Sequence, residues 1–215
     1  MWPLVRKNAI HFVLYIGVML IVLSQFWFGT KKGEGSYFVF MQILWTFLLV
    51  SGGISISEKD EEKNRGYQFL KTLPITDREI VLSKVFLSGL SAGVLTMYNI
   101  ITALLLVKQT EFRQIFIPLV ILWGLFCMLY SVQMYIGIFK HGFTKQIKIF
   151  WFFAIGVFSI VIFGNLLFKK LVPSLEMIGN FLKSPYWIPL VPIALYYYVK
   201  QVQKAIRVKE NSEVY

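Results

Sequence analysis

The chain has 215 residues, of which 57% are hydrophobic and only 15% are charged, and its formal net charge at pH 7 is +11. Soluble globular domains carry about a quarter charged residues, so this composition excludes an ordinary soluble domain and predicts a membrane protein. The basic residues occur singly or in pairs at the ends of apolar runs. A nucleic-acid-binding surface needs a continuous basic stripe instead, so we expect no nucleic-acid partner.

Six apolar segments are long enough to be transmembrane helices, which predicts an all-α polytopic membrane protein with a single transmembrane domain over residues 1–215. About 20 residues of helix cross a hydrocarbon core roughly 30 Å thick. In chain order, the predicted spans are 8–30, 35–57, 77–107, 114–139, 149–168 and 184–206. A polar connection, 58–76, joins the second span to the third.

The sixth predicted span is the shortest in its charge-free part. That part covers residues 184–199 and contains Pro189 and Pro192, so we expect a kink there. The span can reach across the membrane if Lys200 and Lys204 extend their ammonium groups toward the lipid headgroups.

The distribution of basic residues predicts the orientation of the helices. With six spans, 15 Lys and Arg residues fall on the side that holds both termini and the 58–76 connection, and 7 fall on the other side. Because cytoplasmic loops carry the excess of positive charge, both termini and this connection are predicted to be cytoplasmic.

The predicted membrane interior holds no Asp, Glu, Lys or Arg, which disfavours an ion-coupled transporter. The chain also lacks the P-loop, zinc-protease and serine-hydrolase motifs, so we expect no catalysis, metal or cofactor binding by this chain. Polar and small residues at depth are candidates either for packing between helices or for lining a translocation path. They are Gln42, Thr46, Gly89, Gly93, Asn99 and Gln133.

The stretch from Ser57 to Lys84 holds 12 of the 33 charged residues. Placing 12 charges in hydrocarbon at about 3 kcal/mol each is prohibitive, so most of this stretch is predicted to be aqueous. In its middle part, apolar residues are spaced three and four apart, which predicts a short amphipathic helix. The apolar face is formed by Tyr67, Phe69, Leu70 and Leu73.

Pro74 is expected to end this short helix, because the residue before a proline is disfavoured in helical geometry. Thr76 and Glu79 then have the spacing of a capping box, which predicts that the next helix begins near Asp77. The residues alone leave two roles open for the short helix: it rests on the membrane interface, or it docks a soluble partner.

The stretch EKDEEKNRGYQFLKTLPITDREIVLSK resembles the loop between the second and third helices of small permease subunits of type-2 ABC exporters. In that family an acidic residue ends the second helix, and a pattern "rG…fl.tLP.t..eiv.sK" leads into the third. The matching residues are Glu58, Arg65, Gly66, Leu70, Leu73, Pro74, Ile75, Thr76, Ile80, Val81 and Lys84.

The resemblance implies a permease of a bacterial-type plasma membrane that forms a homodimer or heterodimer with a second permease chain. A separate P-loop ATPase would bind ATP and Mg²⁺ and would dock on the 58–76 connection, whose helix would be the coupling helix. The docking residues it implies are Glu58, Glu62, Arg65, Gly66, Tyr67, Phe69, Leu70, Leu73 and Pro74.

The function expected from these observations is export of a hydrophobic or amphipathic cargo, for instance a toxin-like or antimicrobial peptide, a lipid or an apolar drug. The charge-free spans favour such a cargo. Two alternatives are a non-transporting membrane scaffold or sensor that docks a cytoplasmic partner, and an ion-coupled secondary transporter.

Overall fold

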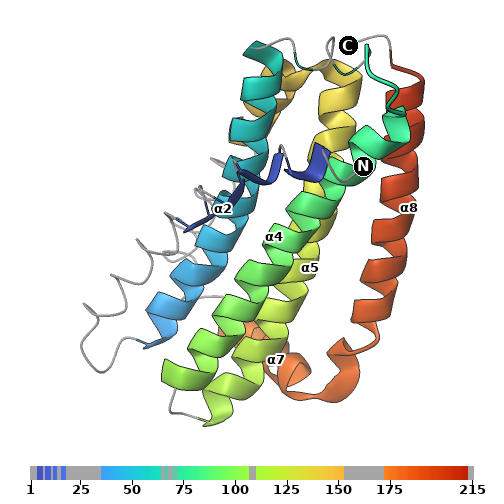
Figure 1. The fold of residues 1–215 in the computed structure, drawn as a ribbon. Coiled ribbons are helices and arrows are strands. Elements are labelled where there is room, and N and C mark those ends of the chain that lie inside the picture. Colours follow the sequence, from blue (N-terminus) through green and yellow to red (C-terminus); the bar gives the residue numbers. More distant parts are fainter. Residues whose placement is uncertain are drawn as a thin grey trace.

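The structure is a computed structural model, and it describes residues 4–6, 8–10, 12–13, 16–17, 35–63, 66, 70, 72–106, 110–152 and 172–212. Its helices are α2 (Gly35–Lys63), α4 (Asp77–Leu106), α5 (Thr110–His141), α7 (Val172–Lys183) and α8 (Leu190–Glu210), with a short 3-10 helix, η2 (Pro185–Trp187). Residues 143–152 are helical as well. Throughout this described part the regular structure is helical, so the predicted all-α class is confirmed (Figure 1).

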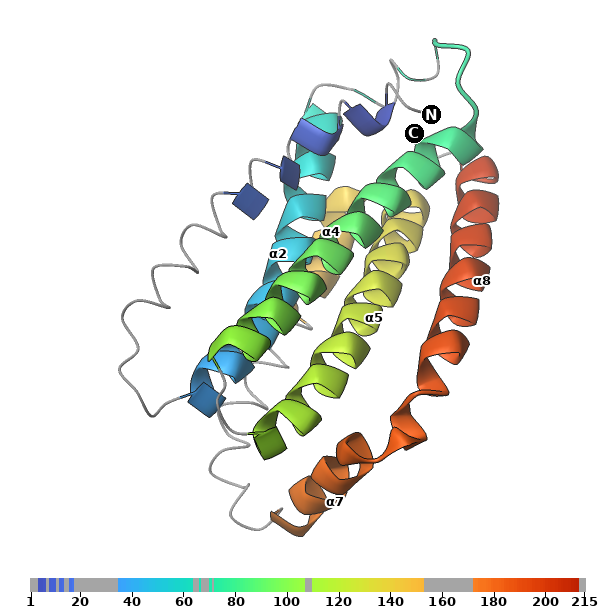
Figure 2. The same ribbon diagram turned by 60° about the horizontal axis from the view of Figure 1, so that its bottom comes forward.

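The long helices form a bundle in which α5 is central. It contacts α2, α4, α7 and α8. Figures 1 and 2 show α2 and α8 on opposite sides of the α4–α5 pair, and α7 at one end of the bundle. The ends of α2, α5 and α8 and the start of α4 lie together at the opposite end (Figure 1). We call this the connection end, because the 58–76 connection lies there.

Two helical segments in the described residues are long and apolar enough to cross a membrane, Asp77–Leu105 and Arg113–His141. They correspond to the third and fourth predicted spans. Parts of the first and fifth predicted spans fall on 18–30 and 153–168, which lie outside the described residues. The set of six spans therefore stays a prediction.

Two boundaries differ from the sequence prediction. Helix α2 continues to Lys63, although the predicted span ends at residue 57. The kink predicted in the sixth span is not found, because α8 begins only after Pro189, and Pro192 lies in its first turn. A proline near a helix start removes an N–H that has no partner there in any case, so both prolines start the helix without bending it.

Aromatic rings join α2 to α5 near the middle of the bundle. The ring of Phe47 in α2 lies 4.8 Å from that of Tyr130 and 6.2 Å from that of Trp123, measured between centroids. Phe150, from the helical stretch 143–152, is 6.1 Å from Phe47. Such separations are typical of favourable tilted ring pairs, so this cluster holds the helices in a fixed relation.

Candidate functional site

Helix α4 begins at a capping box. The Thr76 backbone N–H donates to Glu79 Oε2 at 3.1 Å, and the Glu79 backbone N–H donates to Thr76 Oγ1 at 3.2 Å. The Thr76 hydroxyl is also 3.2 Å from Glu79 Oε2. These reciprocal bonds satisfy donors that a helix start leaves open, and they fix the first residue of α4 at Asp77, where the sequence predicts it.

The segment before this cap turns sharply. The Leu73 N–H donates to the Leu70 carbonyl at 3.2 Å, and Pro74 follows directly. Gly66 and Leu70 are themselves helical. A proline then separates this segment from α4, in the order that the sequence predicts.

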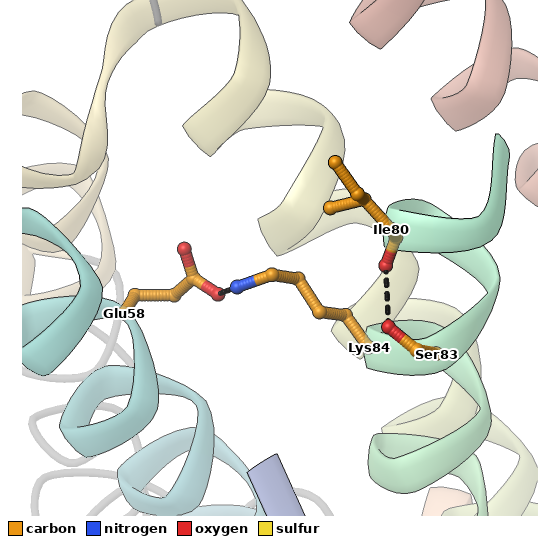
Figure 3. A network of polar contacts seen from close by, with 4 residues as sticks. All are labelled: Glu58, Ile80, Ser83 and Lys84. Carbon is orange, nitrogen blue, oxygen red and sulfur yellow. Dashed lines mark hydrogen bonds and ion pairs between the residues drawn. The ribbon is translucent and has the colours of Figure 1, made fainter. Parts of the chain in front are cut away.

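A buried ion pair joins α2 to α4 close to this turn. The Lys84 ammonium donates to Glu58 Oε1, and each residue is only 1% exposed (Figure 3). Lys84 lies about 12 Å along α4 from the Thr76 cap, at a rise of about 1.5 Å per residue. Removing one partner of such a pair leaves an uncompensated buried charge, so the pair strongly favours one relative position of the two helices.

Two further helices add residues around this pair. The Lys84 Nζ atom is 6.0 Å from the centroid of the Tyr135 ring in α5, and Tyr135 stacks on Phe139 at 6.0 Å. Lys209 of α8 is buried, and its Nζ atom is 5.6 Å from the Phe139 ring. Cations over aromatic faces are attracted electrostatically, so the rings connect the two lysines.

Glu61 completes this group as a second buried carboxylate, about one turn after Glu58 in α2. It acts electrostatically on the Tyr135 hydroxyl. Within the described residues, that hydroxyl has no hydrogen-bond partner. We call Glu58, Glu61, Lys84 and Lys209, with the rings of Tyr135 and Phe139, the charged cluster. Helices α2, α4, α5 and α8 each contribute to it.

The predicted docking residues divide into buried and exposed ones. Glu58 and Leu70 are buried inside the chain, Leu70 as part of the hydrophobic core, so neither side chain lies on a surface that a partner can reach. Gly66 is buried too, and a Cβ added to it would lie 3.4 Å from Glu61 Cα and collide with the Glu61 carboxylate. A larger residue at this position would have to displace the buried Glu61 carboxylate, so glycine lets this segment lie close to α2.

The remaining docking residues are exposed or undescribed. Leu73 and Pro74 are exposed. Glu62 is exposed and accepts hydrogen bonds from the Thr144 hydroxyl at 3.1 and 3.3 Å, one to each carboxylate oxygen. Three more lie outside the described residues: Arg65, Tyr67 and Phe69.

The polar residues predicted for helix packing or for a pathway have different surroundings in the structure. Asn99 Nδ2 donates to Thr46 Oγ1 at 2.7 Å, and both side chains are buried, so this pair links α4 to α2. Gln133 is exposed on α5. Gln42 lies in α2, but its side chain is outside the described part.

The two glycines of α4 have different surroundings. A Cβ on Gly89 would lie 2.9 Å from the Tyr198 hydroxyl of α8, so Gly89 permits close packing of α4 on α8. A Cβ on Gly93 would meet no atom within 4 Å. Of these two glycines, Gly89 is therefore the one with a packing role within the described part of the chain.

Comparison with known protein families assigns the chain to a family. A family model described as "ABC-2 family transporter protein" matches residues 4–206. The chain belongs to this family. Neither the comparison with curated proteins nor that with solved structures gave a match. The resemblance found in the 58–84 stretch is thus confirmed over most of the chain.

As an ABC-2 permease, the chain is the non-catalytic membrane component of a transporter. ABC-2 permeases work with an ATPase subunit, which performs the nucleotide chemistry. This membership does not fit the two alternatives considered from the sequence, a non-transporting scaffold and an ion-coupled transporter.

Proposed function

We propose that this ABC-2 permease is the membrane subunit of an exporter, and that its ATPase docks on the 58–76 connection and moves α4. The chain would cross the membrane six times with both termini in the cytoplasm, and it would pair with a second permease copy or a paralogue. ATP and Mg²⁺ would bind to the ATPase subunits. The observation that carries the proposal is the buried Glu58–Lys84 pair at the base of that connection.

The exposed residues of the connection support docking at this place. Leu73 and Pro74 are solvent-accessible apolar groups directly before the α4 cap, and Glu62 is an exposed acid at the end of α2. Together with Arg65, Tyr67 and Phe69, they would form the coupling surface. Leu70 would support that surface from beneath, through its place in the core.

The charged cluster supports a mechanical role. A push on the connection would reach the capped start of α4 first, since Pro74 leaves only a short segment between the docking residues and Thr76. Lys84 would carry the displacement to α2 through Glu58. Packed interfaces of this kind switch between discrete arrangements rather than deforming continuously, so the cluster would favour one of two positions of the helices.

The cargo is proposed to be hydrophobic or amphipathic, for instance a peptide or an antimicrobial. Apart from the charged residues of 77–84 at the start of the third span and Lys200 and Lys204 near the end of the sixth, the predicted spans contain no Asp, Glu, Lys or Arg. The Thr46 and Asn99 side chains already bond to one another. Polar groups that satisfy each other leave few free sites for a strongly polar cargo, which would have to exchange its hydration for protein contacts.

The proposal is tested by nucleotide-dependent distances in the permease–ATPase complex in nanodiscs. Spin labels at Arg78 and Arg207, both exposed at the connection end, report the separation of α4 and α8 in a Cys127→Ala background. We expect ATP with Mg²⁺ to shift the distance distribution, and ADP to reverse the shift. An identical distribution in all nucleotide states would contradict the proposal.

A second sample tests what the charged cluster contributes to the nucleotide-dependent shift. The double variant Glu58→Leu and Lys84→Leu removes both buried charges, so the helices keep a filled contact without the ion pair. We expect it to retain the ATPase and to show a smaller nucleotide-dependent shift. An unchanged shift would exclude the cluster as the transmitting element.

A further inference from the structure

An apolar groove of about 310 Å³ lies between α5 and α8. Its walls include Leu125, Phe126 and Leu129 from α5 and Ile193, Ala194 and Tyr197 from α8. Phe126, Ile193 and Tyr197 are exposed, so the groove is open along its side to the surroundings of the bundle. With α5 and α8 crossing the membrane as proposed above, that side would face lipid.

One end of the groove becomes polar. Helices α5 and α8 run in the same direction, toward the connection end (Figure 2). Along α5, the residue one turn after Leu129 is Gln133, which is exposed. Along α8, Lys200 follows Tyr197 by one turn and is exposed as well, and Lys204 lies one turn further.

The polar end of the groove is basic. The Lys200 ammonium lies over the Tyr196 ring at 4.8 Å from its centroid, one turn beyond Tyr197 of the groove wall. Arg207 continues the exposed basic face of α8.

We propose that the α5–α8 groove binds an anionic phospholipid from the leaflet at the connection end of the bundle. One acyl chain lies along Leu125, Leu129 and Ile193, and the phosphate is held by Lys200 and Lys204. The chemistry matches at both ends, because lipid chains prefer an apolar surface and cations beside it attract an anionic headgroup.

A second copy of the chain fits this groove less well. A twofold contact brings the same patch of each copy together, so the exposed cations of α8 in one copy would face those of the other. Lys200, Lys204 and Arg207 would then repel one another, whereas an anionic lipid neutralises them.

The test uses the full-length permease in nanodiscs of phosphatidylcholine and phosphatidylglycerol, with a trace of either lipid carrying a photoreactive group in its acyl chain. Peptide mapping gives the fraction of label in 122–129 and 190–197. We expect phosphatidylglycerol to label these segments more than phosphatidylcholine does. Lys200→Gln with Lys204→Gln should lower this preference by about fivefold for each lysine removed, the usual attraction of one cation to an anionic surface.

Two further variants complete the design. Lys145→Gln with Lys148→Gln removes the same charge from exposed positions elsewhere and should keep the preference. Ala194→Trp fills the groove and should abolish labelling of both segments without changing the preference for anionic lipid at other sites. Equal labelling by the two lipids, or labelling that Ala194→Trp leaves unchanged, would overturn the proposal. Disulfide-linked dimers of an Ala194→Cys variant would overturn it in favour of a second copy.

Discussion

Glu58 and Lys84 place a carboxylate and an ammonium group inside the helix bundle, where an unpaired charge is very unfavourable. Each is 1% exposed, and each compensates the other. Whatever the desolvation of the two groups costs, loss of one partner alone is strongly destabilising, because it leaves the other charge buried and unpaired. The pair therefore strongly favours one relative position of α2 and α4.

Replacing Glu58 with Gln should destabilise the permease by about 3–5 kcal/mol, because Lys84 is left charged and buried. The free energy of unfolding in detergent micelles, measured with a denaturant, checks this value. The exposed Glu62→Gln is the matched control, and a surface change of this kind should stay within about 0.5 kcal/mol. Equal effects of the two substitutions would show that the ion pair is unimportant.

Asn99→Ala should destabilise the protein by about 0.6 to 2 kcal/mol, the range for a hydrogen bond between helices in a membrane. The reason is the loss of the 2.7 Å bond to Thr46. The same unfolding measurement checks it, with the exposed Gln133→Ala as control. If Asn99→Ala keeps full stability and yet lowers ATP-driven transport, Asn99 belongs to a pathway instead.

At the level of elements, α4 connects the proposed coupling surface to the bundle. Its capping box fixes where it starts, Pro74 separates it from the preceding segment, and Lys84 ties it to α2 two turns later. A helix start that frays would absorb displacement, whereas a capped one transmits it. The cap is therefore part of the proposed coupling and not only a source of stability.

Thr76→Ala should cost about 0.5–2 kcal/mol and loosen the first turn of α4, because the Glu79 N–H loses its acceptor. Hydrogen exchange of the peptide covering 77–84 is the measurement, and it should become faster in the variant. Glu79→Gln preserves the reciprocal bonds of the box and should exchange like the unaltered chain. Unchanged exchange in Thr76→Ala would mean that packing alone fixes the start of α4.

The start of α4 could be predicted from the sequence because a capping box depends on residues three apart. The burial of Glu58 could not, because its partner Lys84 lies 26 residues away and only the fold brings them together. One signal was present: Glu58 and Glu61 continue the face of α2 on which Val50 and Ile54 are buried. The predicted span nevertheless ends at residue 57, because the prediction was based on where the charged residues begin and not on this periodicity.

Leu70 and α8 are two further cases in which the sequence pattern alone does not determine the structure. An apolar face on a short helix can turn toward a partner, the membrane or the protein's own core, and the sequence pattern is the same in all three cases. Leu70 packs into the core. Pro189 and Pro192 are compatible with a kinked helix or with a helix start. In the structure η2 comes before them and α8 begins at Leu190, so they lie at a helix start.

On the scale of the whole molecule, the permease is a helix bundle whose connection end combines an exposed apolar turn, a capped helix and a cluster of buried charges. These features are arranged in series from the proposed ATPase contact to the bundle. Family membership assigns the chain to the membrane side of an ATP-driven transporter. In the proposed mechanism, this arrangement would let the permease respond to nucleotide that is bound by the ATPase.

Co-purification of the ATPase with the permease tests the central claim most directly. Leu73 is exposed, so Leu73→Asp should leave the fold intact while it places a charge in the docking surface. We predict that Leu73→Asp loses most of the ATPase and that the apolar Leu73→Met retains it, at equal yields of folded permease. Full retention of the ATPase by Leu73→Asp would contradict docking on the 58–76 connection.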